Sequence, residues 1–183
     1  MNVTVVVAVV VAFIAGGAFG FLNDKALWKP LRSRGTGIIA MMIVSIGLSI
    51  FLRNIFQYVA GGQNHNYSQY SAVVPWEIGP LLVTPKDLVV VLVGLAVLVT
   101  VSLLLAYTRL GKATRAVADN PALASSSGIN VERVISVVWT GGAALAALSG
   151  VLLGLTQGFD YQLGFKILLL IFAAVVLGGL GTI

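Results

Sequence analysis

The sequence contains no cysteine, a single histidine and very little charge. Without cysteine, the 183-residue chain has no disulfide framework and no thiolate metal site. The one histidine, His65, has too few acidic neighbours to form a metal centre, and we interpret it as an ordinary loop residue. Asp, Glu, Lys and Arg make up 9% of the chain, compared with about 25% in soluble domains. These absences exclude disulfide-stabilised and water-soluble classes, and we expect no bound metal and no cofactor.

A complete nucleotide-binding motif is also missing. Gly111 and Lys112 stand next to each other, as they do in a phosphate-binding loop. That motif also requires a glycine five positions before its second glycine, and a Ser or Thr directly after its lysine. Here those positions hold Ala106 and Ala113. We therefore expect no ATP hydrolysis, and no catalytic residue, in this chain.

Hydrophobic residues dominate instead, at 58% of the chain, and the mean hydropathy is +1.02. A helix needs about 20 apolar residues to cross a hydrocarbon core about 30 Å thick. An isolated strand would leave its backbone groups unpaired in lipid, so even the valine-rich first segment is expected to be helical. The sequence predicts an all-α membrane protein, a single polytopic bundle with about five transmembrane helices. The predicted spans are 3–22, 38–59, 88–107, 134–156 and 167–183.

Ionisable residues are nearly absent from these spans. Carriers driven by protons or sodium generally need such residues inside the bundle, so energy for transport is expected to come from outside the membrane. A passive channel fits the same observation. The exception is Arg53, in the outer third of its span. Either its side chain extends to the headgroups, or the helix ends near Leu52.

The net charge of +5 lies mainly in two connections. Residues 23–35 and 108–133 each carry four Lys or Arg residues, and the remaining three basic residues are spread over the rest of the chain. Positively charged connections stay in the cytoplasm, so we expect both of them there and the N-terminus outside. Connection 60–87 is rich in Gly, Asn and Pro and is expected to be irregular. The basic residues form no continuous stripe with interleaved aromatics, so we expect lipid and no nucleic acid as a partner.

Small residues mark two places in the last two spans. One set recurs every four positions and would let two helices approach closely, so we expect helix packing there, with a solute path as the alternative. Its members are Gly142, Ala146, Gly150 and Gly154. A second set weakens the last span, and such breaks are tolerated where they line a cavity, so we expect part of the pathway there. Its members are Gly178, Gly179 and Gly181.

Connection 108–133 contains the capping and stop residues that are typical of a short ordered helix. Arg109 and Lys112 follow span 88–107, where positive charge suits the end of a helix dipole. Further on, Asn120 is a good N-cap, Pro121 suits the first helical position and Gly128 is a natural stop. The helix between them has about two turns, too few for stability on its own. It is either a capped turn or a shape that docks into a groove on a partner.

Asn130 and Glu132 are capping and first-turn residues of the same kind for span 134–156. Asn130 is expected to cap this span, and Glu132 is favourable in its first turn because the N-terminal end of a helix attracts negative charge. The connection is therefore expected to be ordered on both sides of the short helix.

The stretch RAVADNPALASSSGINVERV resembles the permease subunits of ABC importers of the branched-chain amino-acid type. In that family, a stretch Arg-Ala-x-Ala-(Asp/Glu)-Asn-Pro-x-x-Ala-x-x-x-Gly-Ile-Asn is the cytoplasmic loop that engages the ATPase subunit. The matching residues here are Arg115, Ala116, Ala118, Asp119, Asn120, Pro121, Ala124, Gly128, Ile129 and Asn130. Four further stretches are similar to other parts of the family, so the resemblance covers roughly residues 28–183. They are WKPLR, IGLSIFLRN, AALAALSGVLLG and VLGGLGTI.

This resemblance implies a subunit of an ATP-driven importer in a bacterial inner membrane, specific for branched-chain or related amino acids. The implied partners are cytoplasmic ABC ATPase subunits, a second permease subunit and a periplasmic substrate-binding protein. Permeases for urea or short amides share these features and are an alternative within the same family. A passive channel or a non-transporting membrane fragment is the alternative outside it. Family members are longer and have an Asn-Phe-Ala-His-Gly segment before this region and helices after it. We therefore expect a chain truncated at both ends.

Overall fold

The computed structural model describes residues 3–61, 76–78, 81–159 and 162–178, and these are helical apart from one short hairpin. The first helical run consists of α1 (Val3–Asn23), the π-helical turn η1 (Asp24–Trp28) and α2 (Lys29–Ser33). After α3 (Ile38–Ala60), strands β1 (Trp76–Ile78) and β2 (Leu81–Val83) pair antiparallel, with Glu77 opposite Leu82. The remaining helices are α4 (Pro85–Tyr107), α5 (Arg109–Asp119), α6 (Pro121–Ser126), α7 (Val131–Gln157) and α8 (Leu163–Leu177).

Four helices in the described residues are long and apolar enough to cross a membrane, which agrees with the predicted all-α membrane class. They are Val7–Ser33, Ile38–Val59, Asp87–Tyr107 and Val131–Thr156. The fifth predicted span, 167–183, corresponds to α8, whose 15 residues form a shorter apolar helix. At 1.5 Å per residue α8 extends about 22 Å, less than a hydrocarbon core. The rest of that predicted span lies outside the described residues.

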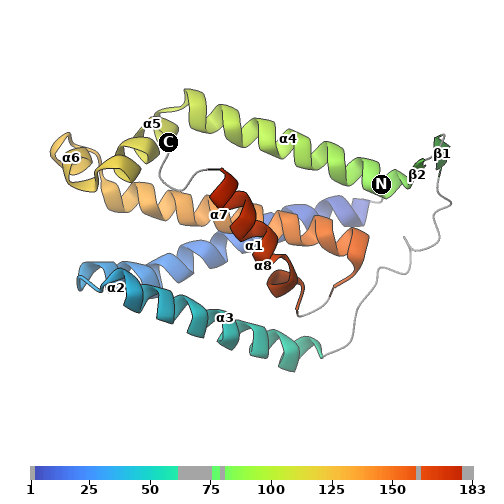
Figure 1. Ribbon diagram of the computed structural model, residues 1–183, viewed down its shortest axis with the longest axis horizontal. Coiled ribbons are helices and arrows are strands. Elements are labelled where there is room, and N and C mark those ends of the chain that lie inside the picture. Colours follow the sequence, from blue (N-terminus) through green and yellow to red (C-terminus); the bar gives the residue numbers. More distant parts are fainter. Residues whose placement is uncertain (1–2, 62–75, 79–80, 160–161, 179–183) are drawn as a thin grey trace.

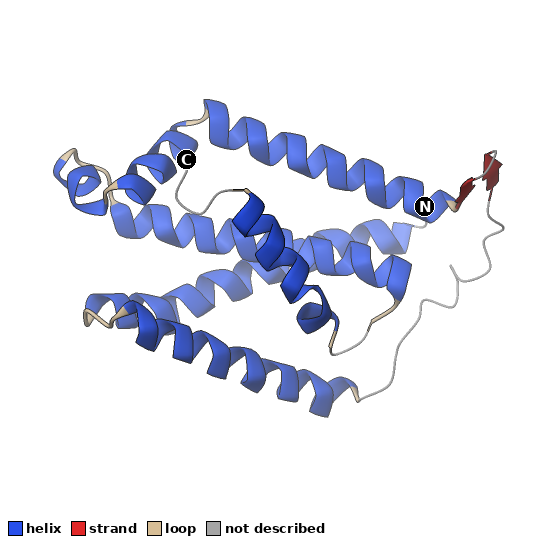
Figure 2. Cartoon of the chain, viewed as in Figure 1, coloured by secondary structure: helices blue, strands red, loops and turns tan. Residues whose placement is uncertain are grey.

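Helices α1 and α7 cross at the centre of the molecule, with α3 and α4 on opposite sides of the pair (Figure 1). Helices α2, α5 and α6 gather at one end, and the β1–β2 hairpin lies at the other end (Figure 2). The two basic connections are therefore on the same end of the bundle. The predicted irregular connection 60–87 contains this hairpin, and residues 62–75 and 79–80 lie outside the described residues.

The basic connection 23–35, which the sequence placed between two membrane spans without predicting a helix, is mostly helical. Helix α1 continues through the π turn into α2 and stops where Gly35 adopts a positive φ of 66°. A π turn widens the helix directly before Pro30, whose missing N–H prevents the ordinary α-helical hydrogen bond. The π turn thus lets the helix pass a residue that would otherwise end it.

Thr108 separates α4 from a second helix that the sequence did not predict. Its backbone is extended, its N–H donates to the Leu104 carbonyl, and its hydroxyl accepts the Gly111 N–H at 3.1 Å. The threonine therefore ends α4 and caps α5. Arg109 and Lys112 consequently lie in the first turn of α5, directly after the end of α4.

The main helix contact joins α1 to α7 through small residues. A Cβ at Gly16 would overlap the Ala147 side chain, and a Cβ at Gly20 would overlap Ala143 and lie 2.9 Å from the Trp139 carbonyl oxygen. Glycine at both positions, four residues apart, therefore allows the two backbones to approach closely.

Outside this contact, α3 and α4 present apolar surface. Large side chains such as Ile43, Phe56 and Leu98 are more than half exposed, which is the state expected for side chains that face lipid. Arg53 lies inside α3, which continues to Ala60, so the alternative in which the helix ends near Leu52 is wrong. Its guanidinium carbon lies 6.0 Å from the centre of the Phe165 ring, within the range of a cation–π contact.

Candidate functional site

The short helix α6 has the caps that the sequence predicted. The Asn120 side chain accepts the Leu123 N–H at 3.1 Å, and Pro121 occupies the first turn. At the other end Gly128 has a φ of 83°, a conformation that favours glycine. Its N–H donates to the Ser125 carbonyl, and the next N–H, of Ile129, donates to the Ala124 carbonyl. These two bonds form a Schellman motif, which ends a helix with a defined geometry.

Helix α7 begins immediately after this motif. The Asn130 side chain accepts the Arg133 N–H at 3.0 Å and caps α7, with Glu132 in its first turn, as the sequence predicted. Only four residues, 127–130, separate α6 from α7, and all four take part in caps or packing. A displacement of α6 would therefore be passed directly to the first turn of α7.

One face of α6 is anchored and the opposite face is bare. Ala124 is 4% exposed and packs with Val117 of α5 and Val134 of α7, in a cluster that we call the α6 anchor. Its neighbour Leu123 is 65% exposed. An apolar side chain that projects from an otherwise anchored and capped helix is suited to bind a partner. Leu123 was not among the residues predicted from the sequence, because the matching motif leaves its position variable.

Arg115 of α5 binds the end of α4. Its guanidinium donates to the Leu105 carbonyl at 3.0 Å and to the Ala106 carbonyl at 3.2 Å, and so satisfies two carbonyls that the helix end leaves free. Gly111 makes this approach possible, because a Cβ there would overlap the Leu105 backbone. A pocket of about 320 Å³ lies between the two helices, lined by Ser102, Leu105, Ala106, Gly111, Thr114 and Arg115.

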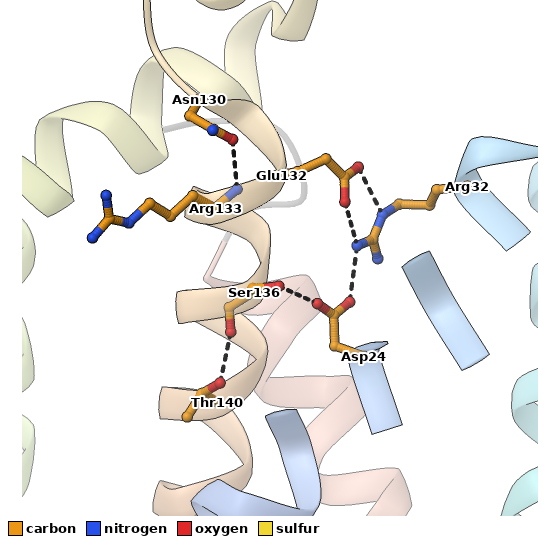
Figure 3. Close-up of polar contacts among 7 residues, drawn as sticks. All are labelled: Asp24, Arg32, Asn130, Glu132, Arg133, Ser136 and Thr140. Atoms are coloured by element: carbon orange, nitrogen blue, oxygen red, sulfur yellow. Dashed lines mark hydrogen bonds and ion pairs between the residues drawn. The ribbon is translucent and has the colours of Figure 1, made fainter. Parts of the chain in front are cut away.

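A polar network connects the first helical run to α7, and we call it the Asp24 network (Figure 3). The Asp24 carboxylate is fully buried; one oxygen accepts from Arg32 at 2.9 Å, and the other accepts from the Ser136 hydroxyl. Arg32 also donates to both Glu132 oxygens, at 3.4 and 3.2 Å. The guanidinium thus bridges two carboxylates that lie more than a hundred positions apart in the sequence.

The Asp24 network has one more negative than positive charge. Its acceptors lie beside the first two turns of α7, where the helix dipole is positive and favours negative charge. Next to it, the Trp28 and Trp139 rings stack with centroids 5.3 Å apart, and Trp28 is almost fully buried. A buried carboxylate is tolerated only when it has charged or hydrogen-bonding partners, and Arg32 and Ser136 are the partners of Asp24 here. Glu132 and the four basic residues of 23–35 are visible in the sequence. No short-range sequence pattern indicates that Glu132 pairs with Arg32, because the two residues are 100 positions apart.

The small-residue positions are distributed differently from the prediction. Within the described residues, Gly142 and Gly150 have open space where a Cβ would be, and Ala146 is exposed. The α1–α7 contact instead uses Ala143 and Ala147, one position further along α7, opposite a Gly16-x-x-x-Gly20 pattern that the sequence does contain. The other predicted positions are Gly154, which faces the Phe159 ring, Gly178, which caps α8, and Gly179 and Gly181, which lie outside the described residues.

The remaining predicted residues, Ala118 and Asp119, are exposed at the end of α5. Among the described residues, no group of three or more His, Asp or Glu side chains is placed to hold a metal ion. The candidate site is made of α5, α6 and the start of α7.

A protein-family comparison matches all 183 residues, 1–183, to the "Branched-chain amino acid transport system / permease component" family. The chain belongs to this permease family. Membership, together with the long apolar helices, makes it a multi-pass membrane protein.

Curated members of the permease family are similar along most of this chain. The "High-affinity branched-chain amino acid transport system permease protein LivH" of Salmonella typhimurium is 33% identical over 179 residues, 94% of this chain and 57% of the relative. The corresponding BraD protein of Pseudomonas aeruginosa is 30% identical over 180 residues, with the same coverage. A probable LivH of Methanocaldococcus jannaschii is 31% identical over 184 residues, 93% of this chain and 55% of the relative.

The chain therefore spans a little more than half the length of these relatives. Their names describe transport-system permeases rather than enzymes. No solved structure matches the chain.

Proposed function

We propose that this chain acts as a permease subunit of an ATP-driven importer for branched-chain or related amino acids. Membership of the permease family over residues 1–183 is the observation that carries the proposal. The names of the relatives support the substrate class. ATP is hydrolysed by separate cytoplasmic ATPase subunits, and a periplasmic binding protein delivers the amino acid. The chain itself resides in the bacterial inner membrane, with its N-terminus outside.

The α6 end is the site that engages the ATPase in this proposal. The α6 anchor holds the helix at Ala124, and its caps define its direction at Asn120 and Gly128. Leu123 projects from the bare face, where an ATPase groove would receive it. The basic connections lie at the same end of the bundle, which supports a cytoplasmic location for this end.

A second permease subunit completes the translocation path. The apolar faces of α3 and α4, and the open positions at Gly142 and Gly150 on α7, support contacts with lipid and with that subunit. The pathway role of Gly178, Gly179 and Gly181 belongs to the same proposal.

Reconstitution into proteoliposomes tests the function. The chain would be combined with candidate ATPase and binding proteins, and uptake of radiolabelled leucine measured with and without ATP. A hydrolysis-inactive ATPase is the control, and we expect uptake only with the active enzyme. Uptake that is indifferent to the ATPase would favour a passive channel and contradict the proposal. ATP-dependent uptake of urea in place of leucine would support the importer function and contradict the proposed substrate class.

A further inference from the structure

The Asp24 network joins the first helical run to the start of α7 by hydrogen bonds and ion pairs, in addition to the close α1–α7 packing and the Trp28–Trp139 stack. On one side are α1, η1 and α2; on the other is the start of α7, which the Schellman motif and Asn130 tie to α6. Further from the α6 end than the network, α1 and α7 are held together by the Gly16 and Gly20 contacts. At the α6 end, the described hydrogen bonds and ion pairs between α2 and α7 are those of Arg32 with Glu132.

We propose that the Asp24 network is the positioning element that transmits displacement of α6 to the α1–α2 helical run. This inference rests on the proposed function, because it assigns the route by which an ATPase at α6 acts on the membrane helices. Glu132 lies in the first turn of α7, directly after the link to α6. Its two bonds to Arg32, and those of Asp24 to Arg32 and Ser136, hold α2 and η1 to the first two turns of α7.

The geometry suits a connection that bears load. Arg32 contacts Glu132 through two of its nitrogens, and a two-point contact resists rotation as well as separation. Asp24 is fully buried beneath it, so water does not compete for its bonds. Glu132 is less enclosed, with 44% of its side chain exposed, which makes it the member whose loss leaves the Asp24–Arg32 pair intact.

Glu132→Gln is therefore the variant that tests transmission with the least damage to the fold. Arg133→Gln is the matched control: Arg133 lies in the same turn, is exposed, and points away from Arg32 in Figure 3. In the reconstituted importer we expect Glu132→Gln to lower leucine uptake per ATP hydrolysed about tenfold, within the range that coupling between sites produces. ATPase binding stays unchanged, Arg133→Gln retains parental coupling, and Glu132→Asp restores most of it.

A distance measurement supplies a second readout that a purely structural role would not change. The chain has no cysteine, so spin labels at Ser33→Cys on α2 and Ser126→Cys on α6 report one distance. In the parent we expect ATP to leave this distance unchanged, because the two helices move together. In Glu132→Gln we expect ATP to shift or broaden it.

Three results would overturn the inference. Parental uptake per ATP in Glu132→Gln would refute the network alone, since the parent would still transport. Parallel loss of insertion, ATPase binding and uptake would assign Glu132 a role in stability only. Absence of ATP-dependent uptake in the parent itself would refute the proposed function, and the inference with it.

Discussion

At the level of single residues, the contact between α1 and α7 depends on two glycines. Gly16 and Gly20 let α1 approach α7 until a Cβ would no longer fit. In lipid, helices gain little from the hydrophobic effect when they associate, so close packing of this kind is what holds them together. A side chain at either position would separate the backbones.

Replacement of Gly20 by leucine tests this contact. We expect Gly20→Leu to lower stability by about 1–3 kcal/mol, the usual cost of overpacking, because a side chain there would overlap Ala143 and the Trp139 carbonyl. The measurement is the midpoint of thermal unfolding in detergent. Gly142→Leu is the control, since Gly142 has open space around it. Equal loss in both variants would show that the α1–α7 approach does not limit stability.

At the scale of elements, α5 and α6 are positioned from both ends. Thr108 caps α5, Arg115 ties it to the carbonyls of α4, and Ala124 anchors α6 between α5 and α7. A two-turn helix is unstable alone, so these contacts are what keep α6 folded. Only its bare face remains for a partner.

Leu123 is the side chain that this arrangement presents. We expect Leu123→Ala to weaken binding of the ATPase about tenfold, because exposed apolar anchors carry much of the energy of an interface. Co-purification with the ATPase, followed by an affinity measurement, gives the result. Leu110→Ala is the matched control, a leucine on α5 that is 52% exposed. If both variants lose affinity equally, α6 is not the specific docking element.

At the scale of the whole molecule, the connections alternate between two ends. The connections that contain α2 and α5–α6 lie at one end, and the β1–β2 hairpin lies at the other (Figure 1). Charge follows the same division, since the basic residues concentrate at the α6 end.

Single cysteines test this orientation, because the chain has none of its own. We expect Ser126→Cys and Ser33→Cys to react with a membrane-impermeant thiol reagent only in inverted vesicles. Ser68→Cys, in the connection between α3 and α4, is expected to react only in intact spheroplasts. The reverse pattern would place the N-terminus inside and remove α6 from the cytoplasm.

Local features of this chain could be predicted from its amino acids alone. Bilayer thickness sets the length of a span, so apolar runs predicted the four long helices, and the capping offsets of Asn120, Gly128 and Asn130 predicted α6 and the start of α7. The helical connection after Asn23 was missed because a π turn before Pro30 has no simple sequence signal.

Which helix faces meet could not be predicted in this way, because it depends on how the helices pack against one another. The rotation of α7 about its axis brings Ala143 and Ala147, rather than Gly142 and Ala146, against α1. The same rotation brings Glu132 and Ser136 to Arg32 and Asp24 across more than a hundred residues. Neighbouring small residues on a helix are equally suited to packing by composition, so close packing with a particular partner helix is what selects between them.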